Sequence, residues 1–235
     1  MGLSILLDIL FPKFCLGCGT LGRYICQRCE KTINFYQPQT CPYCERESLH
    51  GLTHPRCKTP WGLDGMYVLA HYDGLIKEVV HRVKYQGQFA LYTDIADLIG
   101  KRFHGHYQFD YFVPVPLAPK REKERGFNQA AKFALAISMY VTRHDRYRQH
   151  TSIIQLLRRT RETKPQFELK YEDRQKNVAG AFTVAYNLTA NNLSRYSFCL
   201  VDDVATTGAT IFECAKVLKR AGGDKVYAIT VARGG

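Results

Sequence analysis

The 235-residue sequence lacks several features that would assign the protein to a common class. It has no apolar run approaching the roughly 18 residues of a membrane-spanning helix, so no membrane span is expected. The apolar stretch at residues 1–14 is interrupted by Asp8 and follows no basic segment, so it predicts a short amphipathic helix rather than a signal peptide. The pattern G-x-x-x-x-G-K-[ST] is also missing, which argues against a P-loop ATPase.

Acidic residues are scarce as well. The chain has 33 lysines and arginines against 21 aspartates and glutamates, which gives a formal net charge of +12. Much of the excess lies between residues 120 and 176, which contain 15 basic and seven acidic residues. A basic excess confined to one segment predicts a polyanionic partner. Pyrophosphate and single-stranded DNA are the two candidates, and charge alone does not separate them.

Cysteine, in contrast, is abundant, and seven of the nine cysteines precede residue 60. Three consecutive C-x-x-C pairs and one H-x-x-C pair form four knuckles, a spacing typical of tetrahedral structural zinc. The predicted ligands form two sites: Cys15, Cys18, Cys26 and Cys29, and then Cys41, Cys44, His54 and Cys57. His50 is the alternative to His54, which gives the more regular spacing. Because protein ligands fill every position, both zinc ions are expected to be structural.

The zinc-binding segment has too few large apolar residues to fold well without metal. Structural zinc contributes roughly 10–16 kcal/mol in peptide models. We therefore expect residues 1–60 to form a zinc-binding module and residues 61–235 to form a second domain. Zinc held by thiolates requires reduced cysteines, which predicts a cytoplasmic protein.

Short apolar strands alternate with amphipathic helices from residue 62 onward. Strands are expected at residues 65–71, 111–115, 153–157, 198–201 and 226–231, and helices at 74–85, 89–103, 128–141 and 209–221. This alternation predicts an α/β fold with a mostly parallel sheet flanked by helices. Ligands of such sheets bind at the carboxyl ends of the strands.

One of these strand ends carries the most informative segment, Phe-Cys-Leu-Val-Asp-Asp-Val-Ala-Thr-Thr-Gly-Ala-Thr at residues 198–210. After Asp202 and Asp203, small and hydroxyl residues lead into a helix, whose first N–H groups favour a phosphate. The threonine hydroxyls add donors, and Gly208 lets the backbone approach a ligand closely. The two carboxylates would repel a phosphate, so they suit neutral hydroxyls or a metal. A phosphate beside a diol describes a ribose 5-phosphate.

This segment resembles the signature loop of type I phosphoribosyltransferases, which bind 5-phosphoribosyl 1-pyrophosphate (PRPP). Two basic runs extend the resemblance, one from Val113 to Gln129 with Arg-Gly-Phe-Asn-Gln at its end, the other from Arg158 to Gln166. With the four knuckles in front, the order resembles the ComF family, bacterial proteins linked to DNA uptake and natural transformation. Some members are amidophosphoribosyltransferase-like. The resemblance covers nearly the whole chain and implies a type I phosphoribosyltransferase fold behind a double zinc ribbon.

The resemblance also implies roles for individual residues. Residues 116–121 correspond to the loop that holds pyrophosphate, and residues from about 158 to 177 to a flexible loop that closes over PRPP and Mg²⁺. The expected catalytic residues are Asp202, Asp203, Lys120 and Arg121. The expected PRPP-binding residues are Val204, Ala205, Thr206, Thr207, Gly208, Ala209, Thr210, Pro116, Leu117, Arg125, Arg161, Lys164 and Lys84.

Three functions are compatible with these features. The first is a phosphoribosyltransferase that uses Mg–PRPP and an unknown acceptor. The second is a non-catalytic component of the DNA-uptake machinery that binds PRPP or single-stranded DNA. The third is a scaffold whose zinc module docks a DNA-translocating helicase. The intact phosphate loop, acid pair and basic loops favour ligand binding over a pure scaffold.

Overall fold

The computed structural model describes residues 12–86, 89–103, 107–144, 152–163, 171–185 and 193–234. At its centre lies a five-stranded sheet in the order β1 (Gly65–His71), β7 (Val226–Arg233), β6 (Phe198–Ala205), β2 (Tyr111–Pro114) and β3 (Ser152–Ile153). Every neighbouring pair in this sheet is parallel. Its central strands are almost continuously buried, as expected of a parallel sheet covered on both faces.

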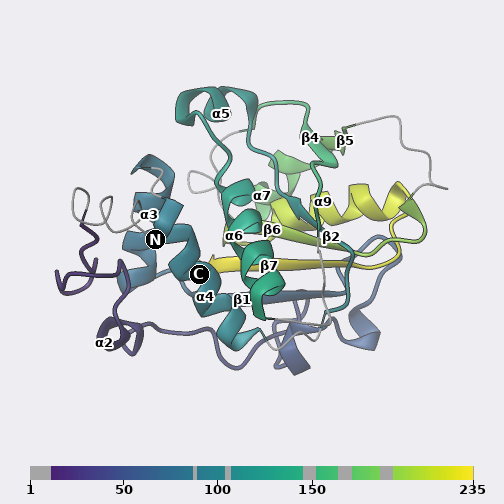
Figure 1. Cartoon of the computed structure of the whole chain (residues 1–235). Coiled ribbons are helices and arrows are strands. Elements are labelled where there is room, and N and C mark those ends of the chain that lie inside the picture. The colour runs from purple at the N-terminus through teal and green to yellow at the C-terminus, as the bar shows by residue number, and fades with distance from the viewer. Residues whose placement is uncertain are drawn as a thin grey trace.

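Helices cover the two faces of the sheet with separate apolar clusters. On one face α3 (Gly74–Gln86), α4 (Phe89–Arg102) and α6 (Gln129–His144) pack against strand residues such as Val201 and Ile229. On the other face α9 (Ala209–Arg220) packs against Leu200 and Ala228. Figure 1 shows α4 and α6 on one side of the strands and α9 on the other. The predicted fold class, a mostly parallel sheet flanked by helices with an N-terminal zinc-binding segment, is confirmed.

The zinc-binding segment contains short elements only: α2 (Gln27–Glu30) and the 3-10 turns η1 (Leu49–Gly51) and η2 (Pro55–Cys57). It follows the open edge of β1, where Gln39 both donates to the Val68 carbonyl at 2.8 Å and accepts from the Val68 N–H at 3.0 Å. In Figure 1 this purple and blue part of the chain runs along the β1 side of the sheet. The segment therefore covers a strand edge that would otherwise expose unpaired backbone groups.

Two strand predictions are wrong. The predicted strand 153–157 is divided between β3, which pairs with β2, and β4 (Leu157–Arg159), which forms a separate antiparallel pair with β5 (Phe182–Val184). The strand predicted to end at Val201 continues to Ala205 as β6. In both cases the partner strands determine where pairing stops, and the apolar pattern alone does not contain that information.

The basic run after β2 forms a short helix, α5 (Pro119–Arg125), where the sequence predicted a proline-stiffened loop. Pro119 occupies the first helical position, and Gly126 ends the helix in the left-handed conformation with φ 75°. These are the favoured positions of proline and glycine at helix ends.

A further short helix, α7 (Tyr171–Val178), precedes β5. Among the described helices, none combines the length and apolar character that a membrane crossing requires. The amphipathic helix predicted at residues 1–14 lies largely outside the described residues.

Candidate functional site

A cleft of about 250 Å³ opens at the carboxyl ends of β6, β1 and β2. Parallel strands place their carboxyl ends on one edge of the sheet, so this is the expected position of a ligand site. The cleft brings together ten residues that the sequence predicted: Lys84, Pro116, Leu117, Arg121, Arg125, Asp202, Asp203, Val204, Thr206 and Thr210. It also contains three that were not predicted: Tyr72, Val115 and Arg159.

The two aspartates line this cleft although β6 continues beyond them. Both are half-buried, and each carboxylate accepts a hydrogen bond from the next backbone N–H: Asp202 from Asp203 at 2.8 Å, and Asp203 from Val204 at 2.7 Å. Each side chain folds back along its own backbone, so both remain at the same edge of the sheet.

The electrostatic environments of the two carboxylates differ. Lys84 Nζ lies 3.1 Å from Asp203 Oδ2 and provides a direct counter-ion. Burial and the neighbouring charge of Asp203 raise the pKa of Asp202 to about 8, against the weaker opposing effects of Lys84 and Arg159. Asp202 thus holds a proton over much of the neutral range. A protonated carboxyl can donate as well as accept a hydrogen bond, which suits a neutral hydroxyl better than a phosphate.

A sharp turn connects β6 to α9 at residues 206–208. Gly208 precedes the first helical residue with φ 74°, a conformation that favours glycine, and no side chain caps the helix in a conventional way. The nearest substitute is Thr207 Oγ1, which accepts from the Ala209 N–H at 3.4 Å. The N–H groups of the first helical turn have no intrahelical partner and carry the positive end of the helix dipole. The turn therefore offers an anion site beside the acid pair.

Not every residue of the predicted phosphate loop lines the cleft. Thr206 and Thr210 do, whereas Thr207 is buried and, with Ala209, faces a groove on the opposite side of the turn. Neither Ala205 nor Gly208 is among the residues that line the cleft. The loop motif identified the right turn, but the side chains of this turn are divided between the cleft and the groove.

The basic wall of the cleft comes from α5 and β4. Arg121 and Arg125 lie one helical turn apart on α5 and both reach the cleft, whereas Lys120 is exposed outside it. A helix rotates by about 100° per residue, so adjacent positions face different directions. Arg161 donates to the Ala179 carbonyl at 2.7 Å and does not line the cleft, and Lys164 lies outside the described residues.

Arg159 of β4 is the main residue that the sequence reasoning missed. Its guanidinium lies 5.3 Å from the centre of the Phe182 ring, and one nitrogen donates to the Thr163 hydroxyl. Burial and the nearby Arg121 lower its pKa, and its buried Nε has no hydrogen-bond partner in the described part of the chain. Two like charges held together in this way indicate an anion site. Strand alternation in the Arg158-Arg159 pair was the available signal, since it places one of the two inward.

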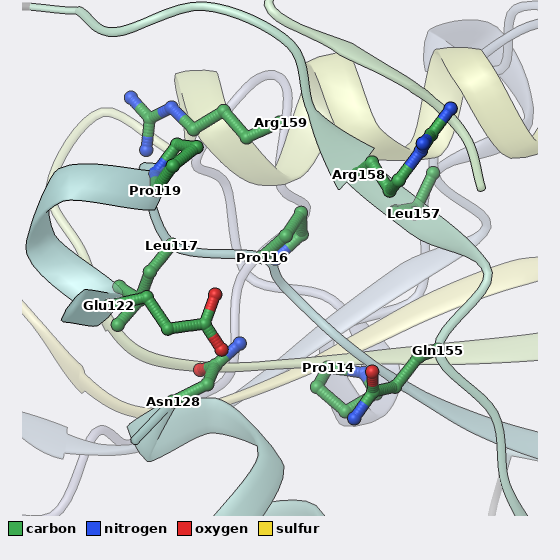
Figure 2. A pocket seen from close by; sticks show the side chains of 10 residues that line it. All are labelled: Pro114, Pro116, Leu117, Pro119, Glu122, Asn128, Gln155, Leu157, Arg158 and Arg159. Atoms are coloured by element: carbon green, nitrogen blue, oxygen red, sulfur yellow. The ribbon is translucent and has the colours of Figure 1, made fainter. Parts of the chain in front are cut away.

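Arg159 also borders a second hollow of about 250 Å³ on the other side of Pro116 and Leu117. Figure 2 shows Arg159 extending over Pro119 while Arg158 points away on the far side of the hollow. The Glu122 carboxylate lies beside Asn128 there. Asn128 is committed to structure, because it donates to the Val115 carbonyl at 3.0 Å and accepts from the Ala130 N–H at 2.9 Å. The 116–117 segment is thus a thin wall between two polar hollows.

The eight predicted zinc ligands form two clusters, in each of which all ligand atoms lie within 4.8 Å of one another. Cys18 Sγ is 3.6 Å from Cys26 Sγ, and Cys44 Sγ is 3.3 Å from His54 Nδ1. His54 Nε2 lies 3.1 Å from the Glu47 carbonyl, so it can donate there while Nδ1 faces the thiols, as in metal-bound histidines. His54, and not His50, completes the second cluster. These donor sets fit structural zinc.

Comparison with known proteins agrees with this architecture. Residues 6–58 match the family model described as a double zinc ribbon domain. Competence protein F of Haemophilus influenzae is 29% identical over 217 residues, which cover 89% of this chain and 90% of that protein. The chain is a homologue of the ComF-type competence proteins. Competence protein ComFC of Bacillus subtilis is 26% identical over 84% of this chain and 79% of that protein. The DNA utilization protein YhgH of Escherichia coli K12 is 26% identical over 94% of this chain and 97% of that protein.

Proposed function

We propose that the chain acts in DNA uptake and that its α/β region binds PRPP with Mg²⁺ in the cleft described above. The names of its relatives, competence and DNA utilization proteins, support the first part. The second part depends chiefly on one observation. A carboxylate pair, an uncapped helix N-terminus and three arginines converge on a single cleft.

Each part of the cleft suits one part of PRPP. The turn at residues 206–210 offers N–H groups and hydroxyls to the 5-phosphate. Asp202 and Asp203 accept from, or donate to, the ribose hydroxyls, to which carboxylates bind without charge repulsion. Arg121, Arg125 and Arg159 face the remaining part of the cleft and suit the pyrophosphate. In this arrangement the neutral ribose lies beside the carboxyl groups, and the charged phosphates lie beside N–H groups and arginines.

The acid pair alone is a poor site for free Mg²⁺. Lys84 already neutralises Asp203, and the raised pKa of Asp202 disfavours its ionised form. Asp202 and Asp203 are the protein groups that would hold Mg²⁺ if it arrived together with PRPP. When bound, it would neutralise charge on the pyrophosphate.

The same groups would serve a transfer reaction. Cleavage of the C1–O bond of PRPP leaves positive charge on the ribose and negative charge on the departing pyrophosphate. Cations that are already in position beside the leaving group stabilise this charge separation. Arg121 lies close enough to help lower the pKa of Arg159, and both line the cleft, so these two arginines are the leading candidates. The acceptor that would attack C1 is not identified by any motif.

Calorimetry with Mg–PRPP tests the binding proposal. We expect Asp203→Ala to weaken binding by about tenfold or more, since a hydrogen bond to a charged group contributes roughly 1.5–3 kcal/mol. Asp202→Ala should weaken it severalfold, since a hydrogen bond of a neutral carboxyl contributes roughly 0.5–1.5 kcal/mol. Asp224→Ala, at the opposite end of the sheet and exposed, is the matched control and should bind as wild type does. Equal PRPP affinity in all four proteins would refute the site.

Turnover is a separate question from binding. Release of labelled pyrophosphate should be followed with nucleobases, ammonia and single-stranded DNA as acceptors. Release that depends on one acceptor class would establish a transferase. Tight PRPP binding without release in any mixture would instead favour a PRPP-sensing component of the uptake machinery.

A second candidate function is single-stranded DNA binding. Lys120, Lys123, Lys132 and Arg143 are all exposed on or near α5 and α6, and none of them lines the cleft. Cations without a role in the cleft are available to a longer polyanion. In this alternative the protein is a DNA-binding component or scaffold, and its zinc module docks a helicase partner.

A further inference from the structure

The second zinc cluster touches the turn that the proposed function assigns to the 5-phosphate. Tyr43 lies within the Cys41–Cys44 knuckle, and its ring stacks on Phe212 of α9 with centroids 5.1 Å apart and an interplanar angle of 21°. The Phe212 N–H donates to the Gly208 carbonyl at 2.9 Å, and a Cβ built on Gly208 would lie 3.0 Å from the Phe212 ring. Tyr43, Phe212 and Gly208 therefore form one continuous contact.

The hydroxyl group of Tyr43 is also held in place, by a hydrogen bond and by close packing. The hydroxyl accepts from the Leu63 N–H at 2.7 Å, and Gly62 leaves no room there for a side chain against Tyr43 and Thr59. Tyr43 and Phe212 line the groove of about 800 Å³ that lies behind the turn, together with Thr207. The turn is thus a partition between this groove and the PRPP cleft, and Tyr43 supports it from the groove side.

A second contact connects the same knuckle to the other flank of the turn. Glu45 immediately follows Cys44 and forms an ion pair with Arg233 at the end of β7. Arg233 is in register with Ala205, and the Gly234 N–H donates to the Ala205 carbonyl at 3.1 Å. Glu45 has φ 58°, which a non-glycine residue adopts only where its surroundings require it. Residues on both sides of Cys44 therefore reach the two ends of the turn.

We propose that Tyr43 is a positioning residue through which zinc at the second cluster orders the phosphate-binding turn. This proposal rests on the proposed function, since it assumes that the turn binds the 5-phosphate. Zinc bound by the four ligands of the second cluster would hold the Cys41–Cys44 knuckle and with it the Tyr43 ring, and the ring in turn limits the positions of Phe212 and Gly208. A turn that is ordered before the ligand arrives binds with a smaller entropy cost. Because coupling between two binding sites is reciprocal, a bound phosphate monoester must also strengthen zinc binding at this cluster.

Two probes separate this role from a general structural one. Ribose 5-phosphate uses the turn, whereas pyrophosphate uses the arginine wall on the other side of the cleft. We expect Tyr43→Ala to lower the affinity for ribose 5-phosphate by about fivefold and to leave the affinity for pyrophosphate unchanged. Fivefold is about the change in affinity that corresponds to the free energy of one well-packed aromatic pair. Tyr43→Phe keeps the ring and should restore most of the affinity. Phe14→Ala, which removes an exposed ring beside Cys15 of the first cluster, is the matched control and should change neither affinity.

The reciprocal effect is measured on the unmodified protein. Equilibrium competition with a zinc chelator, with and without saturating ribose 5-phosphate, should show that one of the two zinc ions is retained more tightly when the sugar phosphate is bound. Tyr43→Ala should abolish this difference. A wild-type protein that shows no such difference would overturn the proposal even if no Tyr43 variant can be purified.

The possible failures are distinguishable. If wild-type protein binds neither PRPP nor ribose 5-phosphate, the proposed function falls and this inference falls with it. If wild type binds both and Tyr43→Ala binds ribose 5-phosphate equally well, only the positioning role is refuted. If Tyr43→Ala loses ribose 5-phosphate and pyrophosphate affinity in parallel, Tyr43 is merely structural, and the positioning role is again refuted.

Discussion

The zinc-binding segment and the α/β region differ in what holds their residues in place. The zinc-binding segment, residues 12–58 of the described chain, has no helix longer than the four residues of α2, and its two four-ligand clusters replace a large apolar core. The α/β region relies on two apolar clusters that flank a parallel sheet. A metal cluster determines the positions of a few nearby residues, whereas a sheet edge assembles residues from distant parts of the sequence. The first kind of site can be found from spacing alone, and the second cannot.

The two clusters themselves also differ in their surroundings. The first lies near α4, where Asp94 accepts from the Tyr24 and Ile25 N–H groups at 3.1 and 3.2 Å, and Arg102 pairs with Glu30 at 3.1 Å. The second lies against the turn between β6 and α9. Loss of zinc from the second cluster should therefore disturb the cleft more than loss of zinc from the first.

The largest expected effect is the unfolding of the zinc-binding segment when a chelator removes its zinc. Elemental analysis should find about two zinc ions per chain, and their removal should cost the segment up to roughly 10–16 kcal/mol per site. We expect hydrogen exchange to show that amides of residues 12–58 lose protection while those of β6 and β7 keep it. Simultaneous loss of protection in the sheet would show that the two regions do not fold separately.

Gly208→Val should damage the cleft while leaving the zinc-binding segment intact. Valine at φ 74° is strained, and its Cβ would press on the Phe212 ring. Because Gly208 does not line the cleft, the valine side chain would displace the turn from behind rather than block the cleft. Ribose 5-phosphate affinity should fall by roughly tenfold or more, since restoring the displaced turn to its phosphate-binding position would reintroduce strain on the order of 1–3 kcal/mol.

Gly180→Val is the control for this substitution. Gly180 has φ 67°, but a Cβ there meets no atom within 4 Å, so the variant shares the backbone strain without the contact. Its ribose 5-phosphate affinity should match that of wild type, and both variants should retain two zinc ions. An unchanged affinity in Gly208→Val would mean that the turn does not bind the phosphate.

The zinc ligands and the cleft were predictable to different degrees for physical reasons. The C-x-x-C and H-x-x-C spacings place ligands on single tight turns, so all eight ligands followed from local sequence. Arg159 and Tyr72 reach the cleft only through the order of strands in space, which no local pattern encodes. Lys120 was misplaced because α5 was expected to be a loop, in which neighbouring side chains have no fixed direction. The mostly apolar run at residues 153–157 concealed the change of pairing partner between β3 and β4.

The cleft should also carry a pH dependence of stability opposite in sign to that of the zinc-binding segment, whose cysteines bind zinc more tightly as pH rises. The pKa of Asp202 is about 8 in the folded protein, above its value of about 3.9 in an unfolded chain. The folded state therefore binds the extra proton, and this contribution to stability should fall as pH rises from about 4 to about 8 and level off above. Urea unfolding of Asp202→Asn, which cannot ionise, should lack this decline. Parallel curves for the two proteins would mean that Asp202 ionises normally.

The smallest expected effect concerns DNA binding by the part of the α/β region's surface that lies outside the cleft. If exposed cations near α6 contact single-stranded DNA, the affinity should fall steeply with salt, with a slope of about −0.7 per phosphate neutralised. Arg143→Glu should lower the affinity for single-stranded DNA severalfold and reduce the slope of its salt dependence. The affinity for PRPP should stay unchanged, because Arg143 is exposed and does not line the cleft. Arg146 and Arg148, for which the same outcome is predicted, lie outside the described residues. Arg125→Glu is the complementary variant. Because Arg125 lines the cleft, this change should lower the affinity for PRPP. If Arg143→Glu and Arg125→Glu weaken both ligands together, DNA and PRPP compete for one basic surface. If no DNA binds even at low salt, the basic residues serve the small anion alone.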